Sequence, residues 1–279
     1  MIRLGGAIVD QGRSPERWLE MIKKYGYSAA VFPGNVNLGD PEVHEYVRLA
    51  EEHNVCIAEV GAWSNPLSPD PAEREKAIEH CISKLALADE VGALCCVNIA
   101  GSFGDSWDGP HAKNFTQEAF DAIVESVRRI IDAVKPKRSF YTLEPMPWVY
   151  PYSTETYLEL IEAIDRPQFA VHFDPVNMIT SPYLYYHNGE FLRDFIRKLG
   201  PYIKSCHAKD IVLGSKLTVH LDEVRPGLGE LDYAAFLTEL AKLGTEVPLI
   251  IEHLESEEEY YEATVYIRKV AADCRVKII

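Results

Sequence analysis

The sequence lacks the segments that would direct a chain into a membrane or attach it to a nucleotide. It contains no run of about 18 apolar residues, the length that a membrane-spanning helix needs. Its opening, MIRLGGAIVD, has too short an apolar stretch for a signal peptide. Neither a GxxxxGK loop nor a Rossmann glycine triplet is present. We therefore expect a soluble, cytoplasmic protein that uses no nucleotide cofactor.

Disulfide bonds and cysteine-bound zinc are not indicated either. The six cysteines form no CxxC pair and no zinc-finger spacing. Four of them lie inside apolar, strand-like runs, where an unpaired cysteine behaves as a small hydrophobic residue. The sequence therefore predicts buried free thiols and a reducing compartment. The cysteines are Cys56, Cys81, Cys95, Cys96, Cys206 and Cys274.

Basic residues are few relative to acidic ones. The 279 residues include 28 Lys and Arg against 43 Asp and Glu, a formal net charge of -15 at pH 7 without a long block of either sign. Such a charge repels polyphosphate, which argues against nucleic acid as a partner. Hydrophobic residues make up 47%, enough for a large core. The length fits one α/β barrel domain that spans residues 1–279.

What the sequence does contain is a regular alternation of strand-like and helix-like segments. Eight apolar, β-rich runs recur, each followed by an amphipathic or charged stretch. The runs are nearly continuous in hydrophobicity, as expected of parallel strands buried on both faces. They begin at Ile2, Ala29, Val55, Leu94, Phe140, Phe169, Tyr202 and Val247. The alternation predicts a closed (β/α)₈ TIM barrel, with a doubly wound open sheet as the alternative.

The stretches between these runs have helical periodicity and recognisable ends. After the first run, Ser14 is placed to cap a helix, Pro15 to begin it and Gly26 to end it. Further helices are predicted within segments 40–54, 70–92, 116–135, 153–164, 188–200, 232–244 and 257–275. Long irregular segments follow strands four, six and seven, at 101–114, 175–187 and 211–230. Because barrel active sites are built at the C-terminal ends of strands, these segments are predicted to form a substrate lid.

Each of the last four predicted strands carries a potential metal ligand at its C-terminal end. These residues are Glu144, Asp174, His207 and Glu252. Any one of the acids alone would fit a helix cap or a partner for a lysine, but the four recur at one barrel unit each and would surround the same mouth. Buried acids are costly unless they are paired or bound to a cation. Three carboxylates and one imidazole therefore predict a divalent-metal site, with Mn²⁺ favoured and Mg²⁺ or Co²⁺ as alternatives.

Short motifs surround these predicted ligands: LEP at Glu144, HFDPVN around Asp174, CHAKD at His207, GLGELDY from Gly227 and IIEH at Glu252. On these motifs the chain resembles the xylose isomerase-like barrel superfamily of sugar phosphate isomerases and epimerases, over nearly its whole length. The superfamily includes ketose 3-epimerases, inosose dehydratases and the endonuclease IV group. The resemblance implies that Glu144 and Glu252 are both metal ligands and catalytic, as the acid and base that move a proton beside a sugar carbonyl. It also implies a homo-oligomer.

Residues near the predicted ligands are candidates for substrate contacts. Strand alternation turns His172 and Lys209 to the same face as the ligands. The alternative for His172 is a hydrogen-bonded core histidine or one that supports a ligand. The alternative for Lys209 is an ion pair with an acid at the rim of the barrel. His111 and Trp107, in the segment after strand four, and Asn177, after strand six, complete the set.

The sequence thus predicts an enzyme, a divalent-metal-dependent isomerase or epimerase that removes a proton alpha to the metal-bound carbonyl of a keto sugar. Asn177 stands where ketose epimerases have histidine, and Leu213 stands where they have arginine. These departures keep open a lyase that cleaves C- or O-linked 3-keto-glycosides by beta-elimination. A DNA-repair nuclease of the endonuclease IV type would need more histidines and a basic groove. A non-catalytic sugar-binding subunit would need no ligand set.

Overall fold

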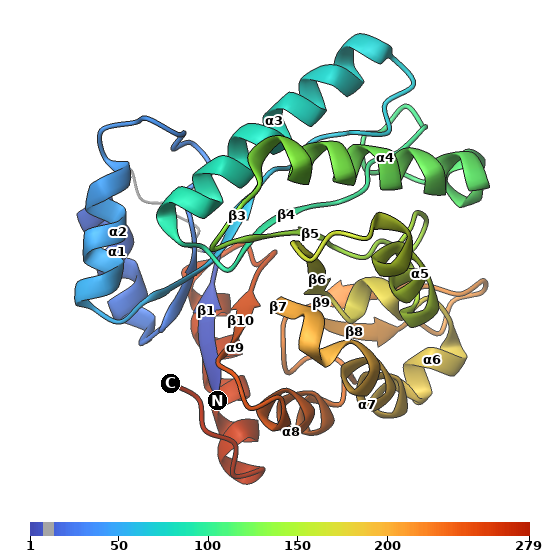
Figure 1. Cartoon of the computed structure of the whole chain (residues 1–279). Coiled ribbons are helices and arrows are strands. Elements are labelled where there is room, and N and C mark those ends of the chain that lie inside the picture. Colours follow the sequence, from blue (N-terminus) through green and yellow to red (C-terminus); the bar gives the residue numbers. More distant parts are fainter. Residues whose placement is uncertain (8–13) are drawn as a thin grey trace.

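The computed structural model describes residues 1–7 and 14–279, which are built around a barrel of parallel strands (Figure 1). Among these residues, eight strands pair in the closed order β1-β10-β7-β6-β5-β4-β3-β2. Because β1 pairs with both β2 and β10, the predicted TIM barrel is confirmed and the open-sheet alternative is wrong. Ile8 and Val9, at the end of the first predicted strand, lie outside the described residues. The strands are β1 Ile2–Gly6, β2 Ala29–Val31, β3 Cys56–Gly61, β4 Cys95–Asn98, β5 Phe140–Leu143, β6 Phe169–Phe173, β7 Ile203–Ala208 and β10 Val247–Ile251.

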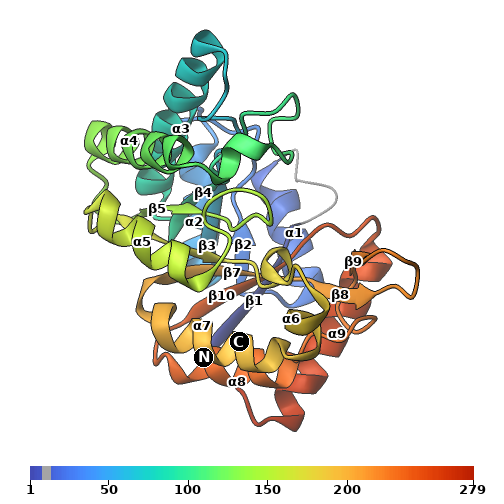
Figure 2. The same cartoon turned by 90° about the vertical axis from the view of Figure 1, so that its right-hand side faces the viewer.

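Helices follow the barrel strands and surround them on the outside (Figures 1 and 2). The first begins and ends where predicted: the Ser14 hydroxyl accepts a hydrogen bond from a backbone N–H of the first turn, and Gly26 adopts the left-handed conformation that ends the helix. No helix in the described part of the chain is long and apolar enough to cross a membrane. The long helices are α1 Pro15–Tyr25, α2 Val43–Glu52, α3 Pro71–Val91, α4 Gln117–Val134, α5 Thr154–Ile164, α7 Asn188–Leu199, α8 Tyr233–Lys242 and α9 Glu257–Asp273.

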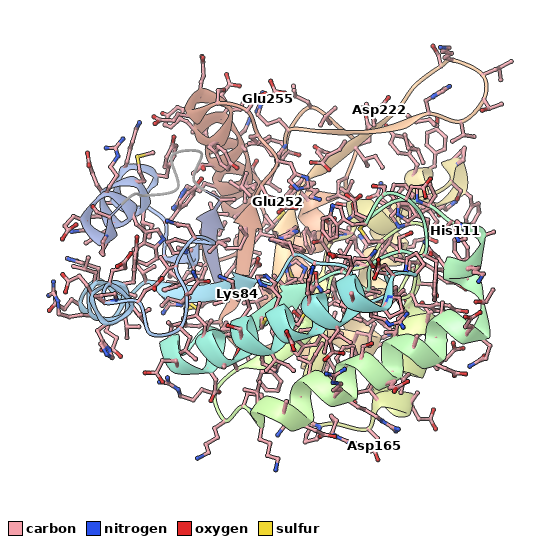
Figure 3. The ribbon with its side chains drawn as sticks, turned by 90° about the horizontal axis from the view of Figure 1, so that it is seen from above. Lys84, His111, Asp165, Asp222, Glu252 and Glu255 are labelled. Carbon is pink, nitrogen blue, oxygen red and sulfur yellow. The ribbon has the colours of Figure 1, made fainter. Side chains whose placement is uncertain are left out.

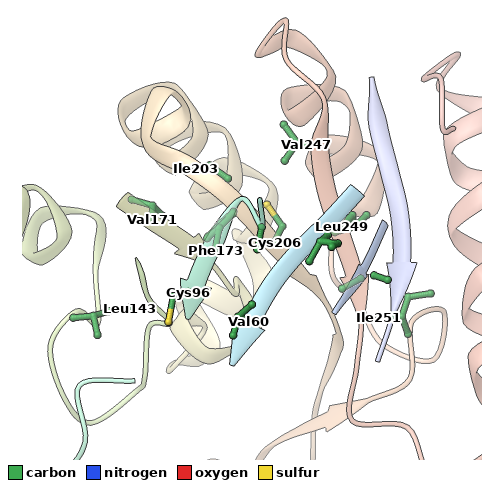
Figure 4. Close-up of a cluster of buried hydrophobic side chains, with 14 of the residues drawn as sticks. Val60, Cys96, Leu143, Val171, Phe173, Ile203, Cys206, Val247, Leu249 and Ile251 are labelled. Carbon is green, nitrogen blue, oxygen red and sulfur yellow. The ribbon is translucent and has the colours of Figure 1, made fainter. Parts of the chain in front are cut away.

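Apolar side chains fill the layer between strands and helices (Figure 4). Leu143, Phe173 and Ile251 belong to this layer, and each is the last residue of its strand. Because side chains alternate along a strand, the next residue in each case points into the barrel. These next residues are the predicted ligands Glu144, Asp174 and Glu252. All six cysteines, each within the described residues, are free thiols as predicted, four of them buried and two half-buried.

The segment after β7 forms a hairpin that the local sequence pattern did not predict. β8 Asp210–Leu213 pairs in antiparallel fashion with β9 Leu221–Val224, within the stretch expected to be irregular (Figure 2). Short helices also occupy the other two long segments, at Ala112–Phe115, Val176–Met178 and α6 Pro182–Tyr186. These elements are too short to show a hydrophobic period, so their formation depends on contacts with the rest of the barrel.

Asp210, the first residue of β8, binds the backbone at the C-terminal end of this segment, at residues 227–231. Its buried carboxylate accepts four hydrogen bonds of 2.9 to 3.1 Å from backbone N–H groups, those of Ile211, Gly227, Gly229 and Leu231. At Gly229 the approach is so close that a Cβ would lie 2.3 Å from Asp210 Oδ1. The second glycine of the GLGELDY motif is therefore required for packing around Asp210.

We predict that Gly229→Ala lowers the free energy of unfolding by about 1–3 kcal/mol, because the added methyl group must push Asp210 and the backbone of Ile211 apart. Gly34→Ala is the matched control, since a Cβ at that glycine meets no atom within 4 Å. Urea unfolding of both variants measures the difference. Equal stability of the two variants would show that Gly229 is not needed for this packing.

Candidate metal centre

Four side chains meet at the C-terminal mouth of the barrel, one from each of four neighbouring strands. Glu144 follows β5 and Asp174 follows β6, while His207 lies in β7 and Glu252 follows β10. We call these four residues the ligand cluster. Figure 3 shows Glu252 toward the middle of the molecule, at the end of its strand. Barrel closure therefore brings the one-per-strand pattern of the sequence to a single place.

The atoms of the ligand cluster are close enough to bind one ion. One potential ligand atom from each residue lies within 4.8 Å of all the others. His207 Nδ1 is 2.8 Å from Glu252 Oε1, 3.5 Å from Glu144 Oε1 and 3.6 Å from Asp174 Oδ2. Asp174 and His207 are fully or almost fully buried. This arrangement can coordinate a divalent cation at the C-terminal mouth of the barrel.

The hydrogen bonding of the cluster provides a test of this fit. His207 Nδ1, Asp174 Oδ2 and Glu252 Oε1 are buried and have no partner with hydrogen-bond geometry, although the two carboxylate oxygens lie within ion-pair distance of Lys209 Nζ. Buried polar atoms are ordinarily satisfied, so three such atoms that face one another suit a shared cationic partner. Carboxylate oxygens with one imidazole nitrogen form a donor set that suits a divalent metal ion. The residues present therefore fit such an ion.

A buried lysine shares this space. Lys209 Nζ is 2.7 Å from Asp174 Oδ2, 2.8 Å from Glu252 Oε1 and 3.8 Å from Glu144 Oε1. Its side chain is 1% exposed, and it lies two residues after His207, on the face that strand alternation predicts. Glu223 of β9 lies 3.5 Å from the same ammonium group. Lys209 therefore offsets part of the negative charge of the ligand cluster.

Opposite charges keep these acids ionised despite their burial. Burial alone would raise the pKa of Asp174 and Glu252, but His207 and Lys209 outweigh that effect and lower both, the pKa of Glu252 to about 2. Burial alone would lower the pKa of His207 and Lys209, but the carboxylates raise both well above their ordinary values. The two acids therefore carry charged oxygens at neutral pH, as a cation site requires.

A further buried carboxylate, not among the predicted site residues, lies behind the ligand cluster. Glu59 in β3 is 1% exposed, and its oxygens lie 3.0 Å from His172 Nε2 and 3.4 Å from His207 Nε2. The Ser205 hydroxyl donates a hydrogen bond to the same carboxylate. Glu59 stands inside the apolar run CIAEVG, and an acid within an apolar strand is the same signal that marks the predicted ligands. That signal could have revealed it.

Glu59 orients His207. When a metal ion takes the place of the proton on Nδ1, an imidazole that donates from Nε2 to a carboxylate presents the lone pair of Nδ1 to that ion, and His207 Nδ1 is the atom that faces the ligand cluster. Burial would raise the pKa of Glu59, but the two neighbouring imidazoles lower it below its ordinary value. His172 is fully buried against Glu59 and His207, and its role as a substrate contact stays a prediction.

A cavity of about 440 Å³ adjoins the ligand cluster, with Glu144, Lys209 and Glu252 in its lining. Small-molecule sites are typically about 300–1,000 Å³. Each long loop contributes to the wall, through Trp107 and Asp108 after β4, Asn177 after β6 and Glu223 of the hairpin. The loops thus surround the site, while their role as a moving lid stays a prediction.

Of the remaining predicted substrate contacts, Trp107 and Asn177 lie at the cavity and His111 does not. Trp107 and Asn177 line the cavity, and the Asn177 amide donates a 2.9 Å hydrogen bond to Glu144 Oε1. His111 is exposed at the start of a short helix, where its Nδ1 accepts a hydrogen bond from the backbone N–H of Lys113. Figure 3 shows His111 well away from Glu252. The structure thus brings Trp107 and Asn177 to the site and leaves His111 outside it.

Known structures share this fold at low sequence identity. The D-psicose 3-epimerase of Clostridium cellulolyticum H10 superimposes with a TM-score of 0.72 at 15% identity, covering 99% of this chain and 100% of its own. The probable 3-DHS dehydratase AsbF of Bacillus anthracis has a TM-score of 0.74 at 16% identity, with 97% and 99% covered. The 3-keto-D-glucoside 4-epimerase YcjR of E. coli has a TM-score of 0.71 at 14% identity, with 96% and 100% covered.

Sequence comparison adds the family. No curated protein matches the chain in sequence. The family model described as xylose isomerase-like TIM barrel matches residues 19–270, which is most of the chain. The structural likenesses, at 14% to 16% identity, support the fold alone. From the family match, the chain belongs to the xylose isomerase-like TIM barrel family.

Proposed function

We propose that this protein is a metal-dependent isomerase or epimerase that removes a proton from the carbon beside the carbonyl of a keto sugar. The observation that supports this most directly is the ligand cluster, whose atoms lie within 4.8 Å of one another beside a cavity of about 440 Å³. The cluster would hold one divalent ion. Mn²⁺ is favoured over Mg²⁺, because an imidazole is among the donors and Mg²⁺ prefers oxygen ligands.

The two carboxylates at the ends of the cluster are proposed as the proton-transfer pair. When bound, the metal ion supplies Lewis acidity that makes the proton beside a carbonyl easier to remove. Glu144 follows β5 and Glu252 follows β10, and two strands separate them in the barrel. They therefore approach a substrate from different directions, so that one carboxylate takes the proton and the other, in its protonated form, donates a different proton to the opposite face.

In Glu144 and Glu252, one carboxylate oxygen is already engaged by neighbouring groups, which leaves the other for proton transfer. Glu144 Oε1 accepts the hydrogen bond from Asn177. Glu252 Oε1 lies 2.8 Å from both His207 Nδ1 and Lys209 Nζ. We assign the proton transfer to the second oxygen, Oε2, of each carboxylate. The ammonium group of Lys209 is placed to stabilise negative charge on a substrate oxygen.

A lyase that acts on 3-keto-glycosides is the second candidate. It begins with the same proton abstraction and differs in that a leaving group then departs from the adjacent carbon. The observation that favours it is an open cleft beside the cavity, next to Trp63 and Trp107, which could receive a leaving group. Product analysis separates the two, since elimination releases a second molecule and epimerisation does not.

We predict one tightly bound divalent ion per chain, because the ionised acids of the ligand cluster repel one another without it. Isothermal titration of EDTA-treated protein with Mn²⁺ gives the stoichiometry and affinity. Asp174→Asn should weaken binding about tenfold or more, since it replaces a charged ligand with a neutral amide. Glu51→Gln, an exposed acid on α2, should bind as the wild type does. A stoichiometry near zero in the wild type would contradict the site.

We further predict that Glu59→Gln weakens Mn²⁺ binding by about 10–100-fold, although Glu59 is not a proposed ligand, because the amide no longer selects the imidazole tautomer that presents His207 Nδ1. The same titration measures the affinity, and urea unfolding checks that the variant is folded. Affinity equal to that of Glu51→Gln in a folded variant would show that Glu59 does not orient His207.

We predict that the enzyme catalyses exchange of the substrate's alpha proton with solvent. Incubation with Mn²⁺ and a panel of keto sugars in D₂O, followed by NMR, detects deuterium at that carbon. Glu252→Gln should slow the exchange by about 10²–10⁴-fold, because it removes a proton-transfer group, while Glu51→Gln should not. Turnover that never incorporates deuterium would indicate a hydride shift or hydrolysis instead.

A further inference from the structure

A second cleft adjoins the cavity of the metal centre. Its volume is about 700 Å³, and it shares Trp63 and Trp107 with the cavity. Trp63 follows β3 and Trp107 follows β4, so the cleft opens at the same end of the barrel as the ligand cluster. The rest of its lining includes polar side chains from the first half of α3 and from the loop after β4. The two hollows therefore form one extended site divided by the two indoles.

The wall between the two hollows is held in place by specific hydrogen bonds. Asn65, in the loop after β3, accepts from the backbone N–H of Ser102 at 2.9 Å and donates to the Ser102 carbonyl at 2.9 Å. Gly101 has φ +96°, and a Cβ there would lie 2.1 Å from Asn65 Oδ1. The Trp148 indole donates to the Asp108 carbonyl at 2.7 Å. Both tryptophan-bearing loops are thus fixed before any ligand arrives.

The surface of the second cleft combines aromatic faces with hydrogen-bonding groups. Trp63 and Trp107 are 45% and 40% exposed, although a tryptophan usually buries most of its large apolar surface. Glu73 and Lys76 form an ion pair of 2.8 Å on α3, and His80 lies one turn further along. A sugar ring has an apolar face of C–H groups and a rim of hydroxyls, which this combination complements. A purely apolar group would leave the polar side chains unmatched.

Charge restricts the ligand further. Two acids of the lining, Glu73 and Asp105, accompany a single lysine, Lys76, which is already paired with Glu73. A phosphate group would therefore meet net negative charge and no free cation among the described lining residues. The chemistry of the cleft suits an uncharged carbohydrate.

We propose that the second cleft is a subsite for the second sugar ring of a disaccharide-type glycoside, whose first ring carries the reacting carbonyl to the ligand cluster. This inference rests on the proposed function for the chemistry at the first ring. It assigns the substrate class as an unphosphorylated glycoside and not a free or phosphorylated monosaccharide. Trp63 and Trp107 contact the link between the rings, and the α3 side chains bind the hydroxyls of the second ring.

Binding measurements without turnover test this subsite. Calorimetric titrations of the Mn²⁺-loaded protein with cellobiose, maltose, glucose and glucose 6-phosphate compare the ligand classes. At least one disaccharide should bind about tenfold more tightly than glucose, and glucose 6-phosphate should bind no more tightly than glucose. Equal affinity for glucose and both disaccharides, or a preference for the phosphate, would overturn the assignment.

Variants within the cleft localise the effect. His80→Ala removes a side chain that lines the second cleft and not the cavity of the metal centre, and it should reduce disaccharide affinity several-fold while glucose affinity stays unchanged. His44→Ala, an exposed histidine on α2, is the matched control and should change neither. Equal loss for glucose and disaccharide in His80→Ala, or no loss for either, would contradict a second-ring subsite.

The subsite and the proposed function fail separately. If the disaccharide preference and its loss in His80→Ala are observed but no alpha-proton exchange occurs with any keto sugar or keto-glycoside, the cleft assignment stands and the proposed reaction is wrong. If exchange occurs with free keto sugars and no disaccharide is preferred, the reaction stands and the subsite is wrong.

Discussion

The burial of three carboxylates at one end of the barrel is the constraint on which the rest of this site depends. Each acid would be costly to bury alone, and together they repel one another. Lys209, at 2.7 to 2.8 Å from Asp174 and Glu252, and His207, which lies between the carboxylates, offset this repulsion. Four neighbouring strands are needed to deliver these groups to one point, so the charge balance of the site depends on barrel closure.

Strand periodicity contains most of the information about this arrangement. An acid that ends an apolar strand has no local partner. Three strands with such ends and a fourth with a histidine near its end indicate a shared mouth from the sequence alone. Lys209 could be placed as well, since alternation sets it on the face of His207. Glu59 could not be paired with His207 from sequence, because the two are 148 residues apart and meet only across the closed barrel.

The loops could be located from the sequence but their shapes could not. Their lengths and positions after strands indicate that they surround the mouth, yet the pairing of β8 with β9 depends on which short runs meet across a turn. The positions of two histidines could likewise be predicted from the sequence, but the directions of their side chains could not. His172 alternates onto the ligand face but is turned toward Glu59, and His111 lies in the correct loop but caps a short helix. Side-chain direction within a face is decided by tertiary packing.

The anchoring of the hairpin by Asp210 has a consequence for how this protein can diversify. Asp210 directly follows Lys209, and its carboxylate holds backbone groups between Gly227 and Leu231, so both ends of the segment after β7 are joined at one point. The hairpin tip, with Leu217 93% exposed, is not part of that junction. Insertions and substitutions at the tip can therefore accumulate at little entropic cost, while the ammonium group beneath keeps its position. The outer end of the hairpin can therefore change without disturbing the charges of the site.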